Sequence, residues 1–321
     1  MKFLSVCSGI EAASAAWTPL GWQAAAFSEI EPFPCSVLAH HYPDVPNRGD
    51  MTKFKEWPDE PINLLCGGTP CQSFSVAGLR AGLDDPRGNL MLTFLAIAAK
   101  YRPRWLVWEN VPGVLSSNGG RDFGSFLGGL AVLGYGFAYR VLDAQYFGVV
   151  QRRRRVFVVG CLGDWRSAAS VLFERHSLQG HPAPRRETGK RIAGQIVPGA
   201  HPGGFNGQEN AGGQLAVAFQ YKASASNSMN PSGVAPTMDK GKSDGLSVQC
   251  GMQVRRLTPV ECEKLQGFPP GYTNVPHRGK PAADGNRYKA LGNSWAVPVA
   301  AWIGRRIEAV ESIQAEMRSA A

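Results

Sequence analysis

The first 161 residues alternate between short apolar runs and helix-prone segments, and this alternation limits the fold more than any other feature of the chain. Apolar runs typical of strands fall at residues 3–7, 24–28, 62–66, 105–108, 137–142 and 156–161. Helix-prone segments fall at residues 11–17, 32–41, 90–100 and 123–133. This order predicts an α/β fold with a mainly parallel sheet. Ligands of such sheets bind beyond the carboxyl ends of the strands.

Five residues with useful chemistry stand at, or just after, the ends of these predicted strands: Gly9, Glu29, Asp50, Cys71 and Glu109. A carboxylate in the place of Glu29 can accept hydrogen bonds from ribose hydroxyls, and Asp50 can accept from an adenine amino group. The loop after the first strand, CSGIEAAS, lacks the GxGxxG spacing of nicotinamide-dinucleotide sites. The pattern therefore favours a nucleoside-bearing cofactor without phosphates.

Cys71 stands in the segment GGTPCQSFS, just downstream of a predicted strand. A thiol there is a candidate nucleophile if helix dipoles or nearby arginines favour its thiolate. A buried cysteine that only fills space is the alternative. Glu109 ends a strand in LVWENVPG, beside Trp108 and Val111. Partial desolvation would raise the pKa of its carboxyl and suit it to donate a proton, whereas a capping or ion-paired glutamate is the alternative.

Four consecutive arginines precede the last predicted strand, in the segment QRRRRVFVVG. Because side chains alternate along a strand, Arg153 and Arg155 should share one face, and Arg152 and Arg154 the other. One pair can then face a site and the other a phosphate backbone; a basic loop is the alternative. The net charge is +9, and residues 151–191 hold ten Arg or Lys against three acids. Such a cluster favours nucleic acid as a partner over a solvated basic face.

Residues 162–253 differ in composition, being rich in Gly, Pro, Ser, Asn and Gln. They are expected to form a small, irregular, short-stranded domain or a large insertion, with disorder as the alternative. Periodic patterns return after Arg255. Thr258 and Glu261 have the spacing of a capping box at a helix start, and residues 295–313 predict a long terminal helix.

The seven cysteines are odd in number and none has CxxC spacing, which disfavours a disulfide framework and a cysteine-rich zinc site. The six histidines lack metal-ligand spacing with acidic partners. No apolar run approaches the ~20 residues that cross a bilayer, and the N-terminus does not resemble a secretory signal. We therefore expect a soluble, cytoplasmic protein that has no metal site and does not enter a membrane.

Five segments resemble, in order, the motifs of DNA cytosine-5 methyltransferases. They are GGTPCQSFSVAG, WENVPG, QRRRRVFVVG, RRLTPVECEKLQGFP and ALGNSWAVPVAAWIG. Each motif alone is modest, but the ordered set is highly specific, and the resemblance covers most of residues 1–161 and 255–305. It implies a Rossmann-like, S-adenosylmethionine-dependent methyltransferase sheet with a smaller irregular target-recognition domain.

The resemblance also implies how the chain is divided. Residues 1–161 would form the catalytic and cofactor-binding domain, residues 162–253 the target-recognition domain, and residues 254–321 a segment that returns to the catalytic domain. The implied cofactor is S-adenosyl-L-methionine. Its implied binding residues are Ser8, Gly9, Glu29, Asp50, Met51, Pro70, Leu90 and Asn293.

The implied reaction is methyl transfer to C5 of a cytosine flipped out of a specific duplex DNA sequence. The implied catalytic residues are Cys71, which attacks C6; Glu109, which holds or protonates N3; Asn110, which fixes the Pro-Cys loop; Arg153, which supports the loop and base; and Arg155, which donates to O2. DNA contacts are expected from Gln72, Ser75, Gln151, Arg185, Arg186, Lys190 and Arg191. A monomer is expected, with double-stranded DNA as partner and a separately encoded restriction endonuclease as a second candidate partner.

The first motif departs from the family pattern Asp-x-Phe-x-Gly-x-Gly-Gly. Ser5 replaces the acid, Cys7 the aromatic residue, and Glu11 and Ala12 the paired glycines. The lost aromatic ring would remove a surface against the cofactor. Two rival functions stay open. One is a tRNA cytosine-5 methyltransferase, although this chain lacks that branch's Cys-Phe-Thr signature. The other is a non-catalytic DNA-binding relative.

Overall fold

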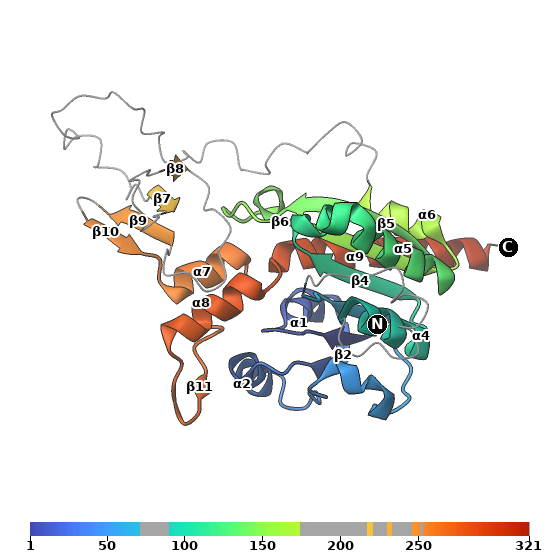
Figure 1. Cartoon of the computed structure of the whole chain (residues 1–321), viewed down its shortest axis with the longest axis horizontal. Coiled ribbons are helices and arrows are strands. Elements are labelled where there is room, and N and C mark those ends of the chain that lie inside the picture. Colours follow the sequence, from blue (N-terminus) through green and yellow to red (C-terminus); the bar gives the residue numbers. More distant parts are fainter. Residues whose placement is uncertain (71–89, 174–216, 221–229, 233–245, 251–252, 321) are drawn as a thin grey trace.

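The computed structural model describes residues 1–70, 90–173, 217–220, 230–232, 246–250 and 253–320 (Figure 1). The main sheet consists of β1 (Lys2–Val6), β2 (Gln23–Ser28), β3 (Leu64–Gly67), β4 (Trp105–Asn110), β5 (Tyr135–Asp143) and β6 (Arg154–Leu162). The helices are α1 (Ala12–Trp17), α2 (Pro32–His41), α4 (Leu90–Tyr101), α5 (Arg121–Val132), α6 (Trp165–Leu172), α7 (Pro259–Gln266), α8 (Asp284–Asn293) and α9 (Val297–Ser319). A 3₁₀ helix, η2 (Met51–Glu56), precedes β3.

The strand order of the main sheet is β2-β1-β3-β4-β6-β5. β1 pairs in parallel with β2 and β3, and β3 pairs in parallel with β4. β6 runs antiparallel to both of its neighbours, β4 and β5. The predicted α/β fold with a mainly parallel sheet is confirmed. β2 and β3 are consecutive strands in the sequence but lie on opposite sides of β1, so the order of strands reverses direction there. Ligands of such folds bind outside the strand ends at this switch point.

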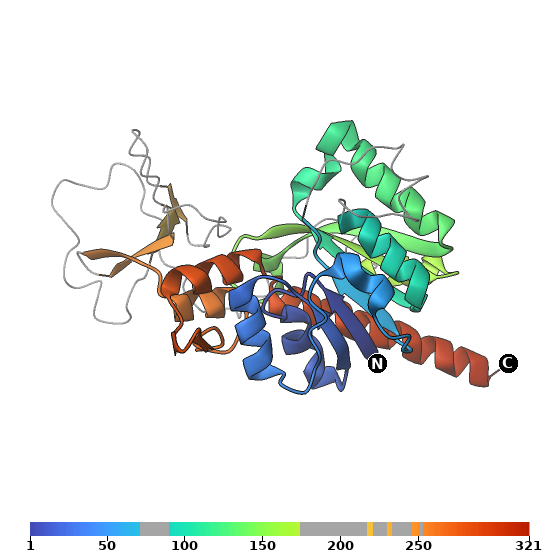
Figure 2. The same cartoon turned by 60° about the horizontal axis from the view of Figure 1, so that its bottom comes forward.

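Both faces of the main sheet are covered, which explains why its strands read as continuous apolar runs. In β4, Trp105 and Val107 belong to one buried cluster, together with residues of α1, α6 and α9. Leu106 and Trp108 belong to the opposite cluster, with residues of α4 and α5. Figure 2 shows the long red helix α9 lying along one side of the sheet, with α4 and α5 on the other side.

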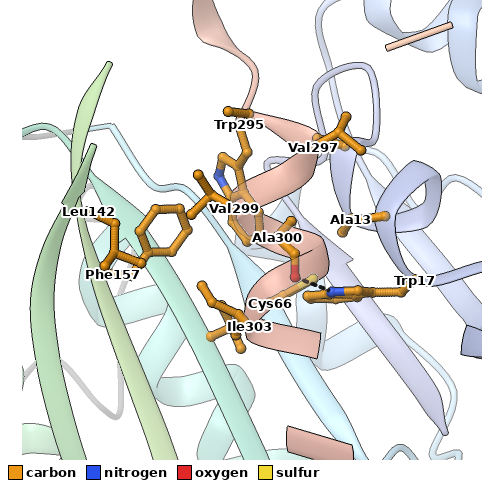
Figure 3. Packing of buried hydrophobic residues seen from close by; sticks show 14 of the residues in the cluster. Ala13, Trp17, Cys66, Leu142, Phe157, Trp295, Val297, Val299, Ala300 and Ile303 are labelled. Atoms are coloured by element: carbon orange, nitrogen blue, oxygen red, sulfur yellow. Dashed lines mark hydrogen bonds between the residues drawn. The ribbon is translucent and has the colours of Figure 1, made fainter. Parts of the chain in front are cut away.

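Two predicted helices have identifiable stabilising contacts. At the start of α7, Thr258 Oγ1 accepts from the Glu261 N–H at 3.3 Å, and the Glu261 carboxylate accepts from the Thr258 N–H at 2.7 Å, so the predicted capping box is confirmed. α9 packs on the N-terminal part of the chain, where Trp17 Nε1 donates to the Ala300 carbonyl at 2.8 Å (Figure 3). The C-terminal helix thus lies against the N-terminal part of the chain, which supports the proposed return of residues 254–321 to the catalytic domain.

A small antiparallel sheet lies at one end of the molecule, away from the main sheet (Figure 1). Its strands are β7 (Val217–Gln220), β8 (Asn230–Ser232), β9 (Leu246–Cys250) and β10 (Gln253–Arg256), in the order β10-β9-β7-β8. β7, β8 and β9 fall within residues 162–253, whereas β10 crosses the expected boundary between residues 253 and 254 and leads directly toward α7.

The sequence analysis did not predict α6 or α8. α8 contains the weak helix formers Gly285, Asn286 and Gly292, so its propensity is low and its packing against neighbours decides its conformation. α6 lies in the segment assigned to target recognition, yet it buries Ala168 and Val171 in the cluster under the main sheet. We therefore propose that the catalytic domain extends at least to the end of α6.

Candidate functional site

A cleft of about 660 Å³ opens at the carboxyl ends of the parallel strands. It lies at the switch point, where such folds bind ligands. The predicted site residues that line it are Gly9, Glu29, Asp50, Met51, Pro70, Leu90, Glu109, Asn110, Arg153, Arg155 and Asn293. Ser8 lines a small adjoining pocket, together with Gly9, Glu109 and Asn293. The fold thus brings residues from both ends of the chain to one place, including Asn293 beside the first loop.

The carboxylate of Glu29 anchors the loop after β1. Its Oε2 accepts from the Gly9 N–H at 2.7 Å, and its Oε1 accepts from the N–H groups of Ile30 and Glu31 at 2.8 and 2.7 Å. A carboxylate has about four acceptor positions, and these bonds use three. One position is left for a ligand hydroxyl.

Asp50 and Met51 stand at the start of η2, on the same side of the cleft. The Asp50 carboxylate caps η2 by accepting from the Thr52 N–H at 2.9 Å. The Met51 sulfur lies 3.4 Å from the Cys7 sulfur, at the position where the aromatic residue of the first motif is replaced. Burial, followed by the charges of Glu29 and Asp50, raises the pKa of Cys7 to about 12, so its thiol is neutral.

These residues fit the nucleoside part of S-adenosylmethionine. Glu29 and Asp50 offer oxygen acceptors, while Ile30, Met51 and Leu90 offer apolar surface along the same cleft. Ile30, which is 68% exposed beside Glu29, was not predicted as a site residue. A cleft of this volume is within the ~300–1,000 Å³ range of small-molecule sites. Cys7 and Met51 add a further apolar, sulfur-containing surface to the cleft.

Glu109 and Arg155 form an ion pair at the other end of the cleft. Arg155 Nε lies 3.1 Å from Glu109 Oε1, and both side chains are largely shielded from solvent. Burial raises the pKa of Glu109, while the charges of Arg155 and Arg153 and hydrogen bonds from Trp295 and Arg155 oppose that rise. A buried acid held against a guanidinium can exchange a proton with a bound base at this point.

Asn110, at the end of β4, holds the segment that leads to Cys71. Its Nδ2 donates to the Thr69 carbonyl at 2.9 Å, and its Oδ1 accepts from the Val111 N–H at 2.8 Å. The Trp108 indole also donates to Thr69 Oγ1 at 3.0 Å. Thr69 is buried and lies two residues before Cys71. The end of β4 therefore fixes the start of the predicted nucleophile loop.

Arg153 links β6 to the junction between α8 and α9. Its guanidinium is 2% exposed and donates to the main-chain oxygens of Gly292 and Ser294. Burial and the charge of Arg155 lower the pKa of Arg153 to about 9. Arg153 and Arg155 both line the cleft, whereas Arg152 and Arg154 are exposed, as the strand alternation predicts.

One predicted DNA contact, Gln151, is fully buried, so its side chain is not available to DNA in this arrangement. Cys71, Gln72, Ser75, Arg185, Arg186, Lys190 and Arg191 lie outside the described residues.

Glu11 and Trp295 also line the small pocket beside the cleft, next to Gly68, and neither was predicted as a site residue. A Cβ on Gly68 would lie 2.9 Å from Glu109 Oε2 and 3.1 Å from Trp295 Nε1, so only glycine fits without a shift. Glu11 is buried in a left-handed conformation, where it accepts from Ser5 Oγ at 2.9 Å and from the Ser14 N–H at 3.1 Å. The substitutions in the first motif were the one signal that could have singled out Glu11.

The part of the chain that the structure describes has neither a metal-ligand cluster nor a membrane-spanning helix. In that part no three His, Cys, Asp or Glu side chains are grouped as metal ligands. Within the same residues, no helix has the length and apolar character needed to span a bilayer.

Similarity to known proteins agrees with this geometry. A family model described as C-5 cytosine-specific DNA methylase matches residues 1–309. The type II methyltransferase M2.BsuMI of Bacillus subtilis (strain 168) is 30% identical over 322 residues, which cover 96% of this chain and 75% of that protein. The type II methyltransferase M.SsoII of Shigella sonnei is 31% identical over 295 residues, covering 87% of this chain and 72% of that protein.

A phage protein and a solved structure are also similar. A protein of Escherichia phage P1 named DNA N-6-adenine-methyltransferase is 34% identical and aligns with 94% of this chain, which spans only 60% of that relative. The crystal structure of the S. pombe Dnmt2 methyltransferase matches the fold with a TM-score of 0.66 at 17% identity, covering 97% of this chain and 99% of that one. Because the family model spans nearly the whole sequence, the chain belongs to the C-5 cytosine-specific DNA methylase family.

Proposed function

We propose that this protein methylates C5 of a cytosine in a specific duplex DNA sequence, with Cys71 as the covalent nucleophile. The observation that carries the proposal is the buried Glu109–Arg155 pair, which shares a cleft with Glu29 and Asp50. At one end of the cleft, the Glu109–Arg155 pair could bind the target nucleobase. At the other end, the carboxylates of Glu29 and Asp50 could bind the nucleoside part of the cofactor. Family membership supplies the reaction class, and methylation by this family implies S-adenosylmethionine.

The protein side of the reaction follows from the chemistry of cytosine, whose C5 is a poor nucleophile. The Cys71 thiolate forms a bond to C6 while Glu109 holds or protonates N3 and Arg155 donates to O2. These contacts absorb the charge that develops on the ring and make C5 nucleophilic. Bound S-adenosylmethionine supplies the electrophilic methyl group. A base then removes the proton from C5, and the bond between C6 and the Cys71 sulfur breaks.

The target atoms are buried in stacked DNA, so the cytosine must leave the helix, at a cost of a few kcal/mol. Asn110 would keep the start of the Cys71 loop in register with Glu109 through its bond to Thr69. The cofactor would lie against Ser8, Gly9, Glu29, Asp50, Met51, Pro70, Leu90 and Asn293. Arg153 acts in this proposal by holding the Asn293 segment rather than by touching the base.

Adenine methylation is the second candidate, because the P1 relative is named an N-6-adenine-methyltransferase. Methyl transfer to an exocyclic amine does not require addition of a thiolate to the ring. A cysteine two residues after Thr69, whose carbonyl Asn110 holds beside Glu109, has no use in that chemistry. We therefore favour cytosine C5. The trapping experiment below also tests tRNA as an alternative substrate. The protein is proposed to act on DNA as a monomer, with or without a partner endonuclease.

The test is a covalent trap. Duplex DNA of mixed sequence that contains 5-fluorocytosine is incubated with the protein and S-adenosylmethionine, and the products are separated on a denaturing gel. Fluorine cannot leave C5 as a proton does, so the adduct should persist. A shifted band with the wild-type chain, and none with Cys71→Ser, is expected.

Three results would contradict the proposal. An adduct with fluorinated tRNA only would move the substrate to RNA. Methyl-labelled nucleosides that contain N6-methyladenine rather than 5-methylcytosine would move the reaction to adenine. An unchanged adduct yield in the Cys71→Ser variant would remove the nucleophile.

A further inference from the structure

Trp295 stands at the junction between α8 and α9 and reaches the carboxylate of Glu109. Both residues line the small pocket beside the cleft, and a hydrogen bond from the Trp295 side chain is among the influences that lower the pKa of Glu109. Gly68 lies next to both groups, because a Cβ placed there would be 3.1 Å from Trp295 Nε1 and 2.9 Å from Glu109 Oε2. The ion-pair contact of Glu109 with Arg155 is at Oε1, 3.1 Å from the Arg155 Nε. Side chains from two separate parts of the chain therefore flank the carboxylate.

The indole of Trp295 is held firmly in place by its neighbours. Its ring packs edge-on against Phe157 of β6 with centroids 5.7 Å apart, and against Trp17 of α1 at 6.4 Å. Figure 3 shows Trp295 at the top of this cluster, with Phe157 and Trp17 below it. Arg153 also fixes the preceding residue, because it donates to the Ser294 carbonyl. Because the ring is already held by this packing, a contact between its N–H group and Glu109 costs no further side-chain conformational entropy.

We propose that Trp295 is a positioning residue for Glu109, whose indole N–H fixes the orientation of the carboxylate that meets the target base. This inference rests on the proposed role of Glu109. Arg155 lies against Oε1, while Oε2 and the indole Nε1 occupy the space beside Gly68, so the carboxylate is confined on two sides. The competing explanation is that the Trp295 ring only fills space in the core, a role that does not require its N–H group.

The contact also has an electrostatic consequence. A donor to the carboxylate stabilises its charged form, so this bond opposes the rise that burial causes in the pKa of Glu109. Removal of the N–H alone should therefore raise the pKa of Glu109 and free its orientation. A hydrogen bond to a charged group of ordinary strength corresponds to about one pH unit.

The experiment replaces Trp295 with Phe, which keeps a ring but removes the donor. Trp17→Phe is the matched control, since that buried indole donates to Ala300 in the same cluster and does not touch Glu109. The pKa of Glu109 is measured in the cofactor-free protein by carbon NMR of labelled glutamate carboxyls, with Glu109→Gln to identify the resonance. Single-turnover methylation is then followed as a function of pH.

The expected result is an upward shift of about one pH unit in the Glu109 titration of Trp295→Phe and none in Trp17→Phe. The maximal methylation rate should fall about tenfold, with cofactor affinity unchanged, and the alkaline limb of the rate profile should move with the titration. Gly68→Ala, which inserts a methyl between the two groups, should shift the same titration with both indoles intact.

If Trp295→Phe matches Trp17→Phe in both titration and rate, Trp295 is only a packing residue and the inference fails. If Glu109→Gln methylates DNA at the wild-type rate, the proposed role of Glu109 fails instead, and the NMR titration still reports on the contact. Should Trp295→Phe not fold, the Gly68→Ala titration decides the question, and an unchanged pKa in that variant overturns the inference.

Discussion

The guanidinium of Arg153 donates to the main-chain oxygen of Gly292 at 2.9 Å, across 139 residues of sequence. The same group donates to the Ser294 oxygen, so it brackets Asn293, whose side chain lines the cleft. The buried arginine that precedes β6 thereby holds the end of α8 beside the loop after β1. If Asn293 contacts the cofactor as proposed, its position depends on this contact.

Replacement of Arg153 with Met should release the α8–α9 junction. Two carbonyls would lose their donor, and we expect destabilisation of about 2 to 4 kcal/mol in urea unfolding. Binding of S-adenosylhomocysteine, measured by calorimetry, should weaken about tenfold, or ~1.4 kcal/mol. Arg154→Met, at the neighbouring exposed position, is the control and should change neither quantity. Equal effects in the two variants would show that the contact does not organise the site.

Replacement of Asn110 with Leu should uncouple the Cys71 loop from β4 without affecting the cofactor. The side chain keeps its size but loses its bond to the Thr69 carbonyl. Because a displacement of ~1 Å can cost about 100-fold in rate, adduct formation with 5-fluorocytosine DNA should slow by about that factor. S-Adenosylhomocysteine binding should be unchanged. Thr69→Val removes only the hydroxyl that Trp108 contacts and should have a smaller effect. A wild-type adduct rate in Asn110→Leu would contradict this role.

The buried carboxylate of Glu11 should make stability depend on pH. Burial, and to a lesser extent the charge of Glu29, raises its pKa to about 7, against hydrogen bonds from Ser5 and Ser14. The folded chain therefore binds this proton more tightly than the unfolded chain. The resulting stability is fully present below pH ~4.5 and is lost as the pH rises through about 7, for a total of about 3 kcal/mol.

Glu11→Gln removes the charge but can keep bonds to Ser5 and Ser14. It should therefore raise the melting temperature relative to the wild-type chain at pH 8 and give no increase at pH 5. Glu316→Gln, on the exposed end of α9, is the control and should show neither effect. If Glu11→Gln changes the melting temperature by the same amount at pH 5 and pH 8, the proton bound by Glu11 does not control the pH dependence of stability.

The basic residues of the variable segment should carry part of the salt dependence of DNA binding. Arg185, Arg186, Lys190 and Arg191 are neutralised together to Gln, and affinity for a duplex is measured across salt concentrations. Each lost phosphate contact should reduce the slope of log K against log salt by about 0.9. Arg318→Gln, near the end of α9, is the control. An unchanged slope in the fourfold variant would rule out phosphate contact by this cluster.

The order of strands and helices in residues 1–161 could be read from the sequence because the inner strands, such as β3 and β4, are buried on both faces and therefore appear as apolar runs. The capping box at Thr258 was equally local, since its two hydrogen bonds join residues three apart. The edge of the sheet where Glu29, Asp50 and Glu109 gather also followed from the alternation, because parallel strands end on the same side.

The sequence did not predict α8, α6 or the contacts of Gln151 and Trp295. α8 is poor in helix formers and depends on tertiary packing, which overrides propensity. Gln151 was expected to contact DNA because it belongs to the arginine segment, but the fold encloses its side chain.

By itself, the sequence determined the sheet, the edge that carries the site, and the ordered motifs that place the chain in its family. Periodicity and chain-local hydrogen bonds contain that information. Only the tertiary structure decided that Arg153 holds the Gly292 segment, that Asn110 holds Thr69, and that Trp295 meets Glu109 beside Gly68. These contacts join residues 41 to 186 positions apart, and no local pattern specifies which distant donors and acceptors folding will bring together.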